Sequence, residues 1–178
     1  MRSAHATWRP AAVASGLALV LAGCGLTHLS DLNFRVDKRL HFVSPEARAT
    51  VRQPVTVTWT IRDFQIVRPG SEPPSHRAGY FGVFVDRTPI KPGDSLRSLG
   101  HGDPACESNP KCPDLDYLHA RDVYPTTATS LRLPELANLR GRDKLQMHTV
   151  IVVLLDTSGR RIGESAWELD VRVRRIGS

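Results

Sequence analysis

The sequence predicts an all-β fold, an antiparallel, immunoglobulin-like β-sandwich of about seven strands with one long disulfide-clamped loop. Three observations lead to this prediction. Apolar and β-branched residues alternate with polar residues over short runs, two other runs are apolar on both faces, and no segment keeps a helical period for ten residues. Short strands joined by turns and ending in a hairpin are typical of sandwiches, and a small closed barrel is the alternative.

The two clearest strands are those in which polar and apolar residues alternate. In residues 55–61 (VTVTWTI), valine, tryptophan and isoleucine point to one face and threonine to the other. Residues 167–174 (WELDVRVR) repeat the pattern with charged residues on the outer face. β-branched residues favour a half-buried, pleated surface. Each run therefore predicts a strand with one face on the core.

Two runs without alternation predict central strands. They are residues 80–85 (YFGVFV) and 150–155 (VIVVLL), which are apolar on both faces. The second run is followed by Asp-Thr-Ser-Gly at 156–159, whose residue types favour a tight turn. The chain therefore predicts a closing hairpin between residues 148–155 and 161–174.

The remaining segments give weaker signals. Alternation predicts strands at 33–43 and 127–133, and a further strand at 115–123. Residues 134–140 predict one short helical turn. Residues 86–116 predict a long irregular excursion. A loop of this length in a small domain is often functional, or it is held in place by a cross-link such as a disulfide.

Length and composition exclude several classes of protein. A chain of 178 residues suits one domain, and 40% hydrophobic with 24% charged residues suits a packed core. No apolar run reaches the roughly 20 residues of a spanning helix, which excludes a multi-span membrane protein. The net charge is +6, but the basic residues are not interleaved with aromatic ones, so we expect no nucleic-acid partner.

The amino terminus has the features of an export signal. Arg2 and Arg9 precede a short apolar stretch, Ala11–Ala22, which ends in Leu21-Ala22-Gly23-Cys24. This tetrapeptide resembles the lipobox of bacterial lipoproteins. The resemblance implies a diacylglyceryl group on the Cys24 thiol and cleavage just before this residue. Two acyl chains on one residue are enough for stable membrane anchoring.

The resemblance divides the chain into three parts. Residues 1–23 are expected to be a signal peptide that is removed, residues 24–32 the lipidated cysteine and a tether, and residues 33–178 the sandwich domain. The predicted location is extracytoplasmic, anchored to the cell membrane, or to the outer membrane where the organism has one. Gly25 is consistent with outer-membrane sorting, because the inner-membrane retention signal is aspartate at that place.

The two remaining cysteines are expected to form a disulfide. Cys106 and Cys112 form an even pair in an oxidising compartment, and the five residues between them (ESNPK) favour a turn. A zinc site usually needs a second pair of ligands at tight spacing, and redox-active pairs are normally Cys-x-x-Cys. Neither pattern is present here.

Polar and aromatic side chains concentrate around this cysteine pair, and we take them as the candidate binding loop. They are His101, Asp103, Asp114, Asp116, Tyr117, His119, Asp122 and Tyr124. The two tyrosines flank the loop and are expected to be exposed. An alternative reading is a calcium, zinc or copper site built on Asp103, Asp114 and Asp116. A plain solvated loop, with aspartates capping turns, is the third reading.

No catalytic motif is present, and no cofactor is expected. The segments YFGVFVDRTPI (80–90) and ESAWELDV (164–171) resemble uncharacterised envelope lipoproteins of GC-rich Gram-positive bacteria, and this resemblance implies no activity. We therefore expect a non-catalytic binding module of the cell envelope, with an envelope protein or a cell-wall glycan as partner. A metal-binding envelope protein using the 101–122 loop is the alternative.

Overall fold

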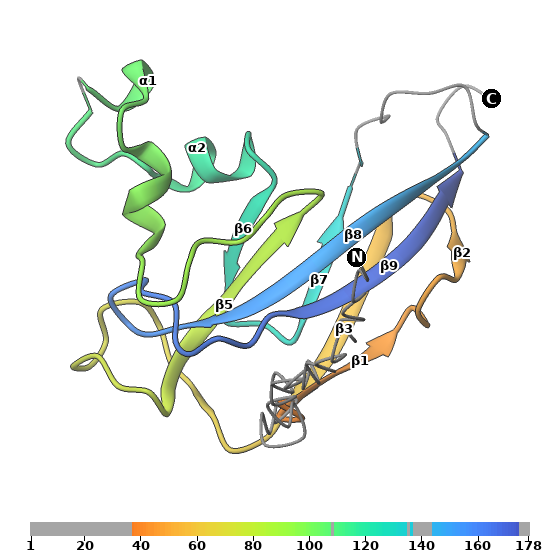
Figure 1. Ribbon diagram of the computed structural model, residues 1–178, viewed down its shortest axis with the longest axis horizontal. Helices are drawn as coiled ribbons and strands as arrows, with labels where there is room; N and C mark the ends of the chain where they lie inside the picture. The colour runs from red at the N-terminus through yellow and green to blue at the C-terminus, as the bar shows by residue number, and fades with distance from the viewer. Residues whose placement is uncertain (1–36, 108, 135, 137–143, 175–178) are drawn as a thin grey trace, which may run out of the picture. The chain divides into compact units, whose positions relative to one another are not determined.

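Strands dominate the computed structural model, which describes residues 37–107, 109–134, 136 and 144–174 (Figure 1). The strands are β1 (Leu40–Ser44), β2 (Thr50–Val51), β3 (Val55–Ile61), β4 (Gln65–Ile66), β5 (Ala78–Val85), β6 (Val123–Thr126), β7 (Ser130–Leu133), β8 (Leu145–Leu155) and β9 (Trp167–Arg174). The helical elements are a 3-10 helix, η2 (Leu96–Gly100), and two short α-helices, α1 (Pro104–Glu107) and α2 (Leu115–His119).

The strands form two separate sheets. β1, β3 and β7 make a three-stranded antiparallel sheet. The larger sheet has the order β2-β9-β8-β5-β4, and β6 pairs antiparallel with β5. Figure 1 shows β1 and β3 on one side of the long ribbons of β8 and β9. The predicted sandwich is confirmed, and the strands that the structure describes form two sheets that do not close into the alternative barrel.

The alternating runs are strands with the predicted faces. β3 covers residues 55–61, and its Val55, Val57 and Trp59 are buried while the threonines between them are exposed or half-buried. β9 buries Leu169, Val171 and Val173 and turns charged residues outward. The period of two in the sequence was therefore a sufficient signal for both strands.

The main core lies between the two sheets. Trp59 of the small sheet and Phe81 of β5 meet edge to face, with ring centroids 5.4 Å apart and planes at 79°. Leu133, Val152 and Val171 belong to the same cluster and are fully or almost fully buried. Offset and edge-to-face aromatic pairs add about 0.5–1.5 kcal/mol beyond the area that they bury.

A second core lies on the other face of the larger sheet. It contains Tyr80 and Phe84 from β5 and Val153 and Leu155 from β8. The segment between β5 and β6 covers these side chains, and we call residues 86–122 the cover. Figure 1 shows α1 and α2 within this segment, at the opposite side of the larger sheet from β1 and β3. The second core explains why the β5 and β8 runs are apolar on both faces.

The cover is tied to the turn that follows β8. The Leu96 amide donates to the Gly159 carbonyl at 3.0 Å, and the Arg161 amide donates to the Asp94 carbonyl at 2.8 Å. The buried guanidinium of Arg161 donates to the Ile90 carbonyl at 2.6 Å. The long excursion expected at 86–116 thus contains short helical turns in its described residues and is joined by hydrogen bonds to the turn after β8.

The predicted hairpin is confirmed, with shifted bounds. β8 and β9 pair antiparallel from Leu145↔Arg174 to Val152↔Trp167. The Asp156 carboxylate accepts from the Ser158 and Arg160 amides, and Gly159 has φ +81°. This left-handed conformation is readily adopted by glycine. The second strand begins at Trp167 and not at residue 161.

Three weaker predictions need correction. Residues 115–119 form α2 and a strand begins only at Val123, so the strand expected at 115–123 is wrong. The strand expected at 127–133 is confined to 130–133. The strand expected at 33–43 appears as β1, at 40–44.

Several predictions fall outside the described residues. They concern the signal peptide, Cys24, the tether, residues 33–36 and most of the helical turn at 134–140. In the part of the chain that the structure describes, no helix is long and apolar enough to span a membrane.

Candidate binding groove beside a disulfide-clamped cover

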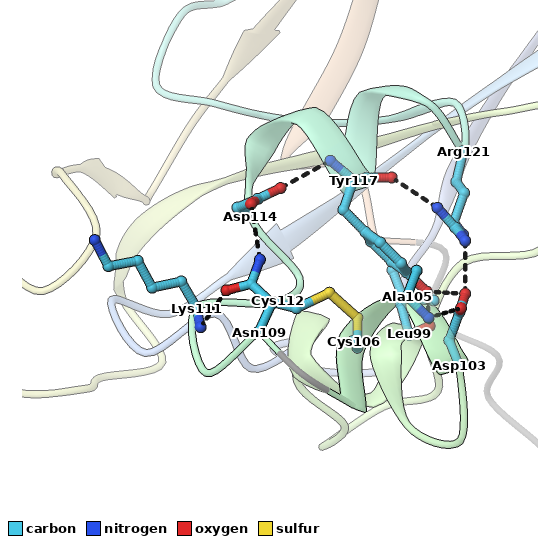
Figure 2. Close-up of a disulfide and its surroundings, with 10 residues drawn as sticks. All are labelled: Leu99, Asp103, Ala105, Cys106, Asn109, Lys111, Cys112, Asp114, Tyr117 and Arg121. Carbon is cyan, nitrogen blue, oxygen red and sulfur yellow. Dashed lines mark hydrogen bonds and ion pairs between the residues drawn. A yellow bond between two sulfur atoms is a disulfide. The ribbon is translucent and has the colours of Figure 1, made fainter.

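The predicted disulfide between Cys106 and Cys112 is present. The two Cα atoms lie 5.1 Å apart, and both side chains pack against the second core. Gly100 allows this approach, because a Cβ there would lie 2.7 Å from the Cys106 Sγ. Figure 2 shows the bond between the α1 region and the segment that leads into α2. The staple therefore fixes the two helical turns of the cover to each other.

A polar cluster holds the cover together beside the disulfide (Figure 2). The Tyr117 hydroxyl donates to Asp103 Oδ2 at 2.6 Å and lies 2.9 Å from the Leu99 carbonyl oxygen. Arg121 donates to the same Asp103 oxygen at 2.6 Å, and its guanidinium lies 3.6 Å from the centre of the Tyr117 ring. The Tyr117 hydrogen bond lowers the pKa of Asp103 and raises the pKa of Tyr117 itself.

Asp114 explains where α2 begins. Its carboxylate accepts from the Tyr117 backbone amide at 2.9 Å, as an N-cap residue does. The other carboxylate oxygen lies 3.4 Å from the Asn109 side-chain amide. The residue thus has a structural role inside the cover.

The other candidate residues divide into a contact pair and isolated side chains. His119 stacks on Tyr124, with ring centroids 5.1 Å apart and planes at 27°. The Tyr124 hydroxyl lies 3.4 Å from Asp122. His101 and Asp116 are exposed, and their side chains have no partner among the described residues. Tyr124 is half-buried and packs against the main core, contrary to the exposure expected for it, whereas His101, Asp116, His119 and Asp122 are exposed polar groups of the cover.

Two further expectations about this loop are wrong. Tyr117 is only 9% exposed, because its ring is part of the second core. Asp103, Asp114 and Asp116 do not come together, since Asp103 pairs with Arg121 and Asp114 caps α2. Among the described residues, no three histidine, cysteine or carboxylate side chains are grouped so that they hold a metal ion.

An open groove runs along the junction between the cover and the larger sheet. Its first part has a volume of about 550 Å³, and its second part has about 360 Å³. The two parts share four lining residues, Pro69, Tyr80, Leu115 and Pro125. Because the shared residues come from a loop, β5, α2 and β6, the groove exists only once the cover is docked on the sheet.

Tyr80 is the notable polar group of this groove. Its side chain is only 5% exposed, and within the described chain its hydroxyl has no hydrogen-bond partner. Burial raises the pKa of Tyr80 to about 12, and the negative charge of Asp156 adds to this shift. Gly159 leaves room for the hydroxyl, because a Cβ there would lie 3.0 Å from it. The groove therefore contains a neutral hydroxyl that is free to donate.

The charged side chains that line the groove are Arg68, Arg97 and Asp114. Arg68 lines the first part and Arg97 the second, and neither side chain has an ion pair or hydrogen bond within the described ranges. Asp114 also lines the second part, but it is occupied by the α2 cap. Asp156, which acts on Tyr80, accepts three hydrogen bonds from its own turn.

A histidine–aspartate pair lies away from the groove. His148 Nδ1 is 2.6 Å from Asp86 Oδ2, and His148 is 2% exposed. The other Asp86 oxygen accepts from the Thr149 amide at 2.8 Å. The pair joins the start of the cover to β8. No serine, threonine or cysteine is hydrogen-bonded to this histidine in the described residues, so the pair does not form a nucleophile–base arrangement.

The groove has no signature in the sequence. Tyr80 lies in a run that predicts a central strand, and Arg68 belongs to no motif. Their side chains come from segments far apart in the chain, so no local spacing marks them. The one local hint was a tyrosine in a strand otherwise apolar on both faces, because a buried tyrosine hydroxyl usually finds a partner.

Comparisons of the chain with protein-family models, with curated proteins and with solved structures found no match. What the protein does is therefore inferred from the groove, the cover and the amino-terminal motif.

Proposed function

We propose that the protein is an extracytoplasmic lipoprotein, anchored to the cell membrane through Cys24, whose sandwich acts as a non-catalytic binding module in the cell envelope. The observation that carries the binding role is the groove of about 550 Å³, which is lined by the largely buried Tyr80, whose hydroxyl has no partner among the described residues. Ligand sites are typically apolar concavities of about 300–1,000 Å³ with a few placed polar groups. The export signal and the Leu-Ala-Gly-Cys sequence support the anchor.

The cover is the proposed contact surface for a larger envelope partner, a protein or a cell-wall glycan. Its exposed His101, Asp116 and His119 offer polar contacts. The disulfide and the Asp103–Arg121 pair hold this surface in one arrangement. Preorganisation of this kind lowers the entropic cost of binding.

The anchor is tested by detergent phase separation of the protein made in its own cell. We expect the native protein to enter the detergent phase, and the Cys24→Ala variant to remain unprocessed and to lose the diacylglyceryl modification. Metabolic labelling with a fatty acid distinguishes the two states. A native protein that incorporates no label would contradict the lipid anchor.

The binding role is tested by a photo-crosslinking amino acid placed in the living cell. Leu115 is the site of choice, because it is 57% exposed and lines both parts of the groove. Arg132, exposed on β7 of the small sheet, is the matched control position. We expect a defined adduct from position 115 and none from position 132. Equal adducts from both positions, or none from either, would refute a binding site at the groove.

A further inference from the structure

We propose that the groove binds a single-chain amphiphilic carboxylate, with the apolar chain along the proline and leucine walls and the carboxylate against Tyr80 and the flanking arginines. This inference rests on the proposed binding function and names the ligand class of that site. Three observations support it: the apolar walls of the groove, the polar and charged groups in its lining, and its volume.

The walls favour an apolar chain. Pro69, Pro113, Leu115 and Pro125 line the groove, beside the hydroxyl-bearing Thr126, Thr127 and Ser158. Proline has no backbone N–H, so the three prolines offer no backbone donor. A peptide that adds to a sheet edge, or a glycan with many hydroxyls, depends on such donors. An acyl chain needs none and gains from the removal of its surface from water.

The polar groups favour an anionic head. The Tyr80 hydroxyl is a donor without an acceptor in the described structure, on a residue that is 5% exposed and lines both parts of the groove. Arg68 lines the first part of the groove and Arg97 lines the second. Within the described residues, neither side chain has an ion pair or a hydrogen bond. The nearby carboxylates, Asp114 and Asp156, accept hydrogen bonds from the protein and are negatively charged, so the two arginines must offset them at the head group. A carboxylate supplies the missing acceptor, because hydrogen bonds to a charged group are the strong ones.

The size favours a single chain. The larger part of the groove measures about 550 Å³, and the two parts overlap at four residues. This volume lies in the range of sites that hold one small ligand, about 300–1,000 Å³. The ligand is therefore expected as a free monomeric acid, and a two-chain phospholipid in a bilayer is the competing source that the experiment must separate.

The test is isothermal titration calorimetry on the exported protein carrying Cys24→Ser, without detergent. The probes are octanoate, decanoate and dodecanoate below their micelle concentrations. Each buried methylene is expected to tighten binding about fourfold, so decanoate binds about 16-fold more tightly than octanoate. Decanoate methyl ester tests the charge, and vesicles of anionic phospholipid test the bilayer as a source. We expect weaker binding of the ester and no heat from the vesicles.

Variants assign the binding to the groove. Tyr80→Phe is expected to weaken dodecanoate binding about tenfold or more, since it removes one hydrogen bond to a charged group. Arg68→Gln with Arg97→Gln is expected to weaken it about fivefold. Leu115→Glu, at an exposed position that the fold does not need, introduces a negative charge and is expected to abolish binding. Arg132→Gln is the control and leaves binding unchanged.

The possible outcomes separate the ligand class from the binding function. No binding of any acid, together with an adduct at position 115 in the cell, overturns the carboxylate and leaves the binding site. If no acid binds and position 115 gives no adduct, both the carboxylate ligand and the binding site at the groove are overturned. Equal binding of acid and ester overturns the anionic head, and heat from vesicles alone overturns the single-chain ligand. Loss of binding in Arg132→Gln equal to that in the groove variants overturns the location.

Discussion

Helix α2 offers a paired test of whether the cover is packed on the sheet. Leu115 and Leu118 lie on the same short helix, and their exposed fractions are 57% and 4%. A leucine-to-alanine change alters helix propensity by the same small amount at each position. The two substitutions therefore differ in what they remove from the packed interior.

The expected magnitudes follow from burial. Leu118 packs in the second core with Phe84, Val153 and Leu155. Leu118→Ala is expected to lower the free energy of unfolding by about 2–3 kcal/mol, the lower part of the range for buried leucine, because a short peripheral helix can partly close the cavity. Leu115→Ala is expected to change it by less than about 0.5 kcal/mol.

The assay is urea unfolding of the exported protein carrying Cys24→Ser, followed by tryptophan fluorescence. Trp59 is 1% exposed in the main core and reports on the sandwich. β5 and β8 contribute side chains to both cores, so loss of packing under the cover is transmitted to the transition that Trp59 reports. If Leu118→Ala costs no more than Leu115→Ala, the cover is not packed on the sheet and the groove does not exist as described.

Three further predictions use the same protein. Replacing Cys106 and Cys112 with serine should lower the free energy of unfolding by about 2 kcal/mol, because the bond closes a short loop; an unchanged midpoint in urea would contradict the staple. The hydrogen bond from Tyr117 lowers the pKa of Asp103 in the folded protein. The ionised Asp103 carboxylate therefore stabilises the fold above the usual aspartate pKa, and this stabilisation is lost as the pH falls through the lowered pKa. Unfolding measured against pH should show this loss, and Asp103→Asn should remove it. The pKa of Tyr80 is about 12, so its neutral hydroxyl supports the fold up to the ordinary tyrosine pKa of about 10, and this support is lost as pH rises through 12. Ultraviolet absorbance of the phenolate should show a step near 12 that Tyr80→Phe removes; a folded protein whose tyrosines all titrate near 10 would refute the burial of Tyr80.

The sheets could be predicted from the sequence because their signals are local. The alternation of polar and apolar residues in 55–61 and 167–174 indicates which side chains face the core. Side chains on the same faces are buried in β3 and β9. Runs apolar on both faces predicted central strands, and β5 and β8 are indeed central. What covers their second face was not visible in these runs.

The cover was not predictable in the same way because its elements are short. α2 has five residues, so it shows one apolar repeat, Leu115 to Leu118, which is too little to establish a helical period. Asp114 was the available signal, since aspartate before an apolar residue is a common helix start. Two of the carboxylates expected to bind a metal, Asp103 and Asp114, have structural roles instead, and a sequence does not show which aspartate an arginine such as Arg121 will pair with.

The candidate site combines a predicted part and an unpredicted part. The cysteine pair is close in sequence, and its disulfide followed from spacing and compartment. The groove brings together Arg68, Tyr80 and Leu115, and these positions meet only through docking of the cover. Such contacts depend on the fold as a whole and leave no spacing to recognise.

Native mass spectrometry of the exported protein carrying Cys24→Ser, with decanoate added, tests the disulfide and the groove together. We expect a polypeptide lighter by two hydrogens than the reduced chain, with one bound decanoate that the Tyr80→Phe variant largely loses. A polypeptide that stays free of decanoate, or an adduct equally abundant in Tyr80→Phe, would contradict the binding of an amphiphilic carboxylate in the groove against Tyr80.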